Sequence, residues 1–292
     1  MKFLILGGNG LVGKSLLQQL NHSAHEVVAT FNNFVPDQNA LKCNILNTVE
    51  LLKVFEKVKP DVVINATNLA GGVDYCESNP ELAKKFHLIA NIEIGNLCTK
   101  HDAKMVLIST DYVFDGENSP YNEEDKPNPL NKYGQYKLEA EQWMQTNLEN
   151  HLIVRTTNVF GWDPLTKTPN FIMGLYFKLV ENQHINVPSF LSGNPTHVSC
   201  LSKAIIEIVE KGATGVFHIV GSSFINRYEW ALKFCELMNF DKRLIAENPI
   251  VPKQMIPRPL NSNLSTCKFT KLFKTNLHNV DEGLKFFIAE RV

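Results

Sequence analysis

The stretch LILGGNGLVG, residues 4–13, decides the fold class. An apolar, strand-like run over 2–6 ends in Gly7, and Gly10 and Gly13 follow at three-residue intervals as a helix-like stretch begins. In a doubly wound sheet this turn receives the pyrophosphate of a dinucleotide, because glycines admit a close backbone approach and the helix N-terminus offers free N–H groups. A plain tight turn has the same pattern, but the position at the first strand–helix junction favours cofactor binding.

The same alternation of short apolar runs and longer amphipathic runs continues through the first half of the chain. Strands are predicted at 2–6, 25–31, 61–67, 104–109 and 151–157, and helices at 11–20, 47–58, 79–101 and 131–147. Strands alternating with helices predict a parallel sheet covered on both faces. We therefore expect an α/β fold, with a Rossmann-type doubly wound NAD(P)-binding domain over residues 1–158.

The second half of the chain has a looser pattern. Helices are predicted at 170–182, 199–212 and 226–238, and one apolar strand at 215–221. We expect residues 159–292 to form mainly a smaller substrate-binding lobe. The core of the strand, 216–220, is a candidate to return to the first sheet.

The composition of the chain indicates which classes of binding partner to expect. The formal net charge of the 292 residues is −1, which gives no electrostatic reason to expect nucleic acid or an acidic membrane. The six cysteines are scattered without a C-x-x-C pair, and the nine histidines never stand at metal spacing, so we expect reduced thiols and no metal. No apolar run is long enough to cross a bilayer, and a cytoplasmic location is expected.

A tyrosine–lysine pair is the first candidate for chemistry. In NKYGQYKLEAE, residues 131–141, Tyr133 and Lys137 are four apart and share a helix face, whereas Tyr136 and Lys137 diverge. Tyr136 is expected in packing or in a substrate wall. A stacked surface pair is the alternative, but Thr110 ends the fourth predicted strand, at the carboxyl edge where ligands bind.

These three side chains fit carbonyl reduction. Lys137 is expected to lower the pKa of Tyr133, which then protonates the developing alkoxide. Thr110 is expected to hydrogen-bond the carbonyl oxygen. Asp111 and Asp115, which flank the same segment, are expected to form turns.

Five segments together resemble the dTDP-4-dehydrorhamnose reductase family, extended short-chain reductases that act on nucleotide-linked 4-keto-6-deoxy sugars. They are GGNGLVG, STDYVFDG, NPLNKYGQYKLEAE, GVFHIVGS and RPLNSNLSTCKF. The resemblance implies that Thr110, Tyr133 and Lys137 are catalytic, and that Lys137 also bonds the nicotinamide ribose.

Further site residues follow from the resemblance. Cofactor-binding positions, besides Tyr133 and Lys137, would be Gly7, Gly10, Leu11, Val12, Gly13, Asn44, Ile45, Asn65, Ala66 and Thr67. Substrate-binding positions would be Tyr112, Asn158 and Arg258, and Trp162 stands in a loop that could also meet the nucleotide-sugar. After the second strand, Thr30, Phe31 and Asn32 include neither an acid nor an arginine, so NADPH is favoured and NADH stays open.

Two departures from the family pattern leave the sugar open. The family usually has tryptophan where this chain has Asn158, and the loop over 65–77 is one residue longer, with Gly71 and Gly72. We expect an NADPH-preferring reductase of a nucleotide-linked 4-keto-6-deoxy sugar in surface polysaccharide synthesis. The alternatives are a sugar-nucleotide epimerase or dehydratase, and a non-catalytic NADP-binding regulatory subunit like the β subunit of methionine adenosyltransferase. A homodimer is left open.

Overall fold

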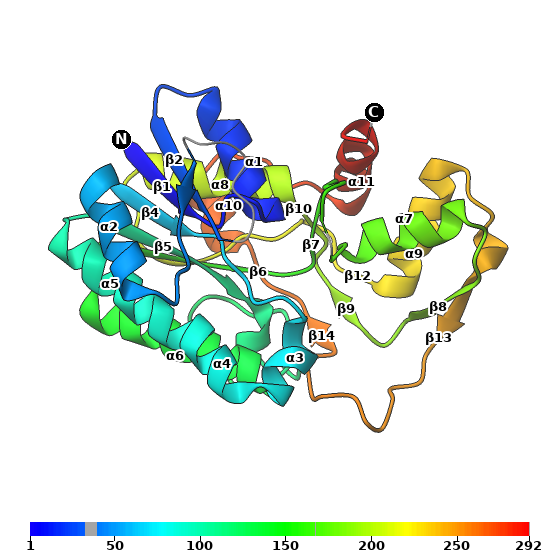
Figure 1. Cartoon of the computed structure of the whole chain (residues 1–292). Helices are drawn as coiled ribbons and strands as arrows, with labels where there is room; N and C mark the ends of the chain where they lie inside the picture. The colour runs from blue at the N-terminus through cyan, green and yellow to red at the C-terminus, as the bar shows by residue number, and fades with distance from the viewer. Residues whose placement is uncertain (33–39, 167, 292) are drawn as a thin grey trace.

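A seven-stranded parallel sheet forms the centre of the molecule (Figure 1). The computed structural model describes residues 1–32, 40–166 and 168–291. The strand order is β11-β6-β5-β4-β1-β2-β3, and every neighbouring pair is parallel. The strands are β1 (Lys2–Leu6), β2 (Glu26–Phe31), β3 (Leu41–Lys42), β4 (Val62–Asn65), β5 (Lys104–Thr110), β6 (His151–Thr156) and β11 (Gly215–His218).

Helices cover both faces of this sheet, because alternate strand residues point to opposite sides. Leu4 and Leu6 pack with α2 (Thr48–Val58), α5 (Ala90–Lys100) and α6 (Lys132–Asn147). Phe3 and Ile5 pack with α1 (Leu11–Asn21), α8 (Val198–Glu210) and α10 (Cys267–Leu272). The predicted doubly wound Rossmann-type fold is confirmed.

The helix predicted at 79–101 is more complex than its pattern suggested. The chain forms α3 (Gly72–Ser78), then α4 (Pro80–Lys84), then one π-helical turn, η1 (Lys85–Ile89), which continues directly into α5. Single π turns inside helices often occur at functional sites. This one places His87 against Tyr133, with ring centroids 5.1 Å apart.

A second group of helices surrounds a separate aromatic core. α7 (Phe171–Val180), α9 (Arg227–Met238) and α11 (Val280–Ala289) enclose Phe160, Trp230, Phe234 and Phe287. Short strands and one 3-10 turn connect this lobe: β7 (Val159–Phe160), β8 (Ile185–Pro188), β9 (Ser192–Gly193), β10 (Thr196–His197), β12 (Ile225–Asn226), β13 (Ile245–Asn248), β14 (Asn261–Ser262) and η3 (Lys242–Leu244). A second 3-10 turn, η2 (Asp111–Val113), directly follows β5 of the central sheet.

The second half of the chain also completes the first sheet. β11 pairs in parallel with β6, with Phe217 opposite Val154. α8 and α10 supply buried side chains to one face of that sheet. The lobe of α7, α9 and α11 lies beside the sheet's carboxyl edge, so that edge faces the junction of the two parts (Figure 1).

Candidate active site

Three adjoining cavities lie at the carboxyl edge of the sheet. Their volumes are about 330, 400 and 550 Å³, and all three are lined in part by Ala66 and Asn68, which follow β4. The first lies over the ends of β5 and β6, the second over the end of β2, and the third over the start of α1. Because they share walls, they form one elongated depression.

The glycine loop allows β1 and α1 to approach more closely than a side chain would permit. A Cβ on Gly13 would lie 2.2 Å from the carbonyl oxygen of Gly7. Gly7 itself has φ of +92°, which side chains rarely adopt. The space above Gly10 is open, because a Cβ there would meet nothing nearer than 3.6 Å. A tight turn with an open face at a helix N-terminus fits a dinucleotide pyrophosphate.

The predicted cofactor residues take two different positions. Gly7, Gly10, Leu11, Val12, Asn44, Ile45, Ala66 and Thr67 line the cavities. Gly13 and Asn65 do not: Gly13 packs beneath the loop, and Asn65 is buried below the end of β4. Asn65 Oδ1 accepts hydrogen bonds from the N–H and hydroxyl of Thr67, and its Nδ2 donates to Asn91 on α5 at 2.8 Å. These two residues shape the cavity walls from behind.

The second cavity is lined by small, apolar and amide side chains, and none of its described lining residues is acidic. Thr30, Phe31 and Asn32 line it, as do Asn44 and Ile45. Among its lining residues in the described part of the chain there is no Asp or Glu for a ribose 2′-hydroxyl and no Arg for a 2′-phosphate. Phe86, from η1, forms a further wall that the sequence pattern did not indicate.

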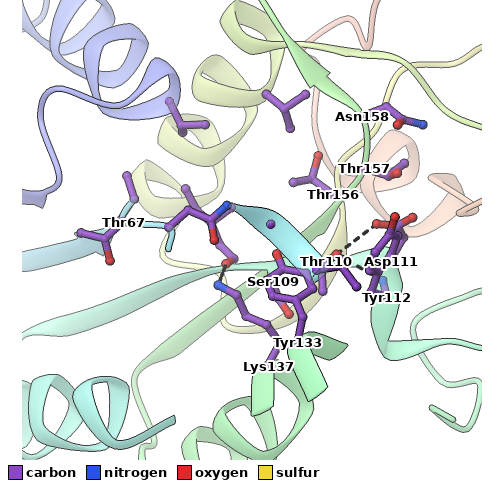
Figure 2. Close-up of a pocket in the computed structure, with 17 residues that line it drawn as sticks. Thr67, Ser109, Thr110, Asp111, Tyr112, Tyr133, Lys137, Thr156, Thr157 and Asn158 are labelled. Carbon is purple, nitrogen blue, oxygen red and sulfur yellow. Dashed lines mark hydrogen bonds between the residues drawn. The ribbon is translucent and has the colours of Figure 1, made fainter. Parts of the chain in front are cut away.

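Local structure at the start of α6 places Tyr133. Asn131 caps the helix, its Oδ1 accepting from the N–H of Gly134 at 2.9 Å. A Cβ on Gly134 would lie 2.1 Å from the carbonyl oxygen of Tyr112, so glycine lets α6 contact η2 directly. Tyr133 and Lys137 both line the first cavity (Figure 2). Tyr136 instead is buried in the apolar core on the α6 side of the sheet, in agreement with the packing role considered for it.

Burial sets the ionisation of this pair. The Lys137 ammonium donates to the carbonyl oxygen of Ile108 at 2.9 Å, and burial lowers its pKa to about 8. Burial also raises the pKa of Tyr133 well above its usual value, although the nearby Thr110 hydroxyl acts in the opposite direction. The expected net lowering of the Tyr133 pKa is therefore wrong, because the pKa is raised. Desolvation dominates, and Tyr133 holds its proton as a donor requires.

His87 is a neutral neighbour of the pair. Burial, and next the charge of Lys137, lower the pKa of His87 to about 2. Its Nε2 lies 3.7 Å from the thiol of Cys76, and its carbonyl oxygen accepts from Asn91 Nδ2 at 2.9 Å. The π turn thus presents an uncharged ring to Tyr133.

The end of β5 brings Thr110 to the same cavity. Thr110 Oγ1 accepts from the N–H of Tyr112 at 3.2 Å and makes a 3.0 Å hydrogen bond with Asp111 Oδ1 (Figure 2). Tyr112 also lines the cavity, as predicted for substrate binding. Asp111 begins the 3-10 turn η2, as expected, its carbonyl oxygen accepting from the N–H of Phe114 at 3.0 Å. Its side chain also lines the cavity and is only 3% exposed, which was not predicted. Asp115 also forms a turn, accepting from the N–H of Glu117.

The remaining predicted substrate residues differ in position. Asn158 lines the first cavity in the left-handed conformation, with φ of +47°, and its amide packs where a Cβ on Gly193 would stand. Arg258 lines none of the three cavities and pairs with Asp74 at 2.6 Å. Trp162 lies away from them, packed against Tyr176 in the second lobe.

Sequence reasoning missed several polar side chains of the cavity. Ser109, Asp111, Thr156 and Thr157 all line it, at the carboxyl ends of β5 and β6. Their position at strand ends was the available signal. The described side chains bring no three His, Cys, Asp or Glu residues together in a way that could hold a metal ion. None of the described helices has the length and apolar character that a bilayer crossing demands.

Comparison with known proteins gives consistent relatives. The family model for the RmlD substrate binding domain matches residues 1–292. Methionine adenosyltransferase 2 subunit beta of Xenopus laevis is 26% identical over 277 residues, covering 92% of this chain and 81% of the relative. The probable low-salt glycan biosynthesis reductase Agl14 of Haloferax volcanii is 27% identical, covering 84% and 83%. The crystal structure of a hypothetical dTDP-4-dehydrorhamnose reductase from Sulfolobus tokodaii matches with a TM-score of 0.85 and 32% identity, covering 97% and 99%.

Proposed function

The chain belongs to the RmlD substrate binding domain family, and from that premise we propose that it is an NADPH-preferring reductase of a nucleotide-linked 4-keto-6-deoxy sugar. Its product would enter surface polysaccharide synthesis. The observation that carries the proposal is the meeting of Thr110, Tyr133 and Lys137 in one cavity that adjoins the glycine loop. The names of the Haloferax and Sulfolobus relatives support a reductase.

Each side chain has a role in this reaction. Bound reduced nicotinamide supplies a hydride to the carbonyl carbon of the sugar. Tyr133 gives its phenolic proton to the carbonyl oxygen, which completes the alcohol. Thr110 orients that oxygen by a hydrogen bond. The Lys137 ammonium has three donors, of which one is used by Ile108, so two remain for ribose and for Tyr133.

The substrate class rests on the polar cavity wall. Tyr112 and Asn158 are the side chains that we propose to contact the sugar. Arg258 would act indirectly, because its guanidinium is paired with Asp74 and also donates to the carbonyl oxygen of Ile256. NADPH is favoured over NADH because none of the described residues that line the second cavity is an acid that could bind a free 2′-hydroxyl.

A second candidate function is a regulatory subunit that binds the cofactor without turnover. Its support is the similarity to methionine adenosyltransferase 2 subunit beta, which is of the same order as the similarity to the reductase relatives. Retention of Thr110, Tyr133 and Lys137 in one cavity favours the enzyme. Tight NADPH binding with no turnover, together with a co-purifying enzyme, would favour the subunit.

The test is the loss of NADPH absorbance with dTDP-, UDP- and GDP-linked 4-keto-6-deoxy sugars. We expect one nucleotide to support turnover, and Tyr133→Phe to lower kcat by about 100-fold or more. Tyr136→Phe is the matched control, since Tyr136 lies in the core and its loss should leave kcat nearly unchanged. If every sugar fails while NADPH binds, the reductase proposal is wrong. Conversion of the sugar without net NADPH loss would indicate an epimerase.

A further inference from the structure

Asp111 is a buried carboxyl without a charged partner. It is 3% exposed and lines the first cavity directly beside Thr110. Among the ion pairs of the described residues, none includes Asp111. Its Oδ2 is fully enclosed and makes no hydrogen bond of standard geometry within the described chain. An ionised carboxylate is costly in such a place, because desolvation penalises the charge and no ion pair offsets that cost.

The hydrogen bonds of Thr110 depend on the charge of this carboxyl. A threonine hydroxyl has one hydrogen to donate and two lone pairs to accept with. One lone pair is taken by the N–H of Tyr112. If Asp111 is ionised, it can only accept, so it takes the single hydrogen of Thr110 across the 3.0 Å contact. Thr110 would then have no hydrogen for a substrate carbonyl.

A protonated Asp111 reverses this contact. Its O–H can donate to Thr110 Oγ1 over the same 3.0 Å, filling the second lone pair. The hydrogen of Thr110 is then free to point into the cavity, where Tyr133 also stands. The geometry of the contact is unchanged, and only the donor and acceptor exchange.

We propose that Asp111 is protonated in the working protein and serves as a positioning residue that turns the Thr110 hydrogen toward the substrate carbonyl. The proposal rests on the proposed reductase function for its last step. No proton leaves Asp111 in the reaction: the proton that completes the alcohol comes from Tyr133. Asp111 therefore controls the direction of one hydrogen bond.

The electrostatic surroundings agree with this assignment. Burial raises the pKa of Asp111, and hydroxyl side chains around it, first Ser262 of β14 and then Thr157 beyond β6, only partly oppose the rise. The titratable or charged groups that face it are Tyr112 from η2, Tyr133 from α6 and Arg227 from α9. The two tyrosines are neutral at neutral pH, since burial raises the pKa of each. Arg227 is the one cation of this set, and it makes no ion pair with Asp111.

The first test measures directly whether the Asp111 carboxyl carries a proton. Infrared difference spectra between the wild type and Asp111→Asn, taken without substrate at neutral pH, should show a protonated-carboxyl band that the variant lacks. Asp115→Asn is the matched control, because Asp115 accepts three hydrogen bonds and its pKa is lowered, first by Tyr121. That control should lose a carboxylate band instead. A carboxylate band for Asp111 at neutral pH would overturn the proposal.

The second test separates positioning from simple packing. Asp111→Ala removes the donor and should lower kcat by about 100-fold, with a smaller effect on KM. Asp111→Asn retains an N–H donor for Thr110 and should recover most of that loss. Asparagine does not ionise, so the decline of kcat at high pH in the Asp111→Asn variant should follow the ionisation of Lys137 alone. If the asparagine variant folds, as judged by thermal unfolding, but is as slow as the alanine variant, the positioning role is wrong.

Failure of the two proposals can be told apart. If the wild type reduces no sugar but shows the protonated band, the reductase function fails and the location of the proton on Asp111 stands. If sugar is reduced while Asp111 is ionised, the reductase function stands and the role of Asp111 is refuted.

Discussion

At the scale of single residues, Lys137 shows how a functional charge costs stability. Its ammonium is buried, and burial lowers its pKa from the usual lysine value to about 8. Below pH 8 both folded and unfolded chains carry the proton, so the full cost of burial is present. Between pH 8 and about 10.4 the unfolded chain binds more protons, and the contribution of this residue to the free energy of unfolding rises with pH.

Replacing Lys137 by an uncharged residue should therefore raise the free energy of unfolding and lower the catalytic activity. Lys137→Met keeps the length of the side chain and removes the charge, so the free energy of unfolding below pH 8 should rise by on the order of 1–3 kcal/mol. The gain should shrink toward pH 10, and kcat should be lost. Urea unfolding at pH 7 and pH 10 measures both effects. Lys132→Met on the same helix is the control, and equal behaviour of the two variants would contradict the argument.

The pH dependence of kcat in the wild type should follow the ionisation of Lys137. As pH rises through about 8, Lys137 loses the proton that makes it a cation and a full set of donors. We expect kcat to fall over that range, whereas Tyr133, whose pKa is raised by burial, keeps its proton. A profile of kcat against pH checks this. A rate that stays constant to pH 10 would show that the charge of Lys137 is not required.

Asn158 has two roles, in the backbone and in the cavity wall, that two substitutions can separate. Its left-handed backbone, with φ of +47°, suits asparagine or glycine, and its amide lines the cavity. Asn158→Gly preserves the conformation and removes the amide, so we expect KM for the sugar to rise about tenfold with little change in thermal stability. Asn158→Ala should lower the thermal stability as well, because alanine is strained at this φ. An unchanged KM in the glycine variant would remove Asn158 from the substrate contacts.

At the scale of elements, the β1–α1 turn makes a sharp prediction. Gly13→Ala places a methyl group 2.2 Å from the carbonyl oxygen of Gly7, which is backbone and can yield only by opening the loop. We expect NADPH affinity, measured by fluorescence titration, to fall by at least about tenfold, with lower thermal stability. Gly174→Ala is the control: Gly174 lies inside α7, and an added Cβ would meet no described atom within 4 Å apart from the adjacent residues and backbone of its own helix. That variant should gain up to about 1 kcal/mol from helix propensity. Equal cofactor affinity in both variants would contradict the argument.

The elements also show how far sequence reasoning could go. The longer strands of the sheet were predicted because each is a continuous apolar run buried on both faces, as in KFLIL of β1. The two-residue strands, such as β9, were not, because their pairing depends on distant segments rather than on a local pattern. α11 was missed although it has a local signal, the capping box of Asn279 and Glu282.

In the candidate site, too, the features that depend on a local sequence pattern were predicted, and those that depend on distant segments were not. Helix periodicity, which is a local property, predicted that Tyr133 and Lys137 share a face, and both line one cavity. The turn at Asp111 was predicted, but its burial in the cavity was not, because that burial depends on Ser262 and Thr157, which approach from β14 and from beyond β6. The direction of the Tyr133 pKa was also wrong, since desolvation depends on packing that no local spacing reveals.

At the scale of the whole molecule, the two halves of the sequence share one core. β11 covers the edge of β6, and α8 and α10 bury Phe3, Ile5 and their neighbours on one face of the sheet. A chain cut after residue 158 would leave only α1 on that face, whose side chains include Val106, Leu152 and Val154, all 0% exposed in the full chain. Such a large apolar surface cannot remain in water in a stable folded domain.

We therefore expect the full chain to unfold as one cooperative unit, and the fragment 1–158 not to fold. Calorimetry of the full chain should give a single transition, which NADPH shifts to higher temperature as its concentration rises. The fragment should aggregate or bind a hydrophobic dye without a cooperative transition. The informative control is a chain cut after residue 220, which retains α8 and β11 but lacks α10; it should be more soluble than the shorter fragment. A cooperative, NADPH-binding fragment 1–158 would show instead that the first half is an independent domain and that β11 adds little to it.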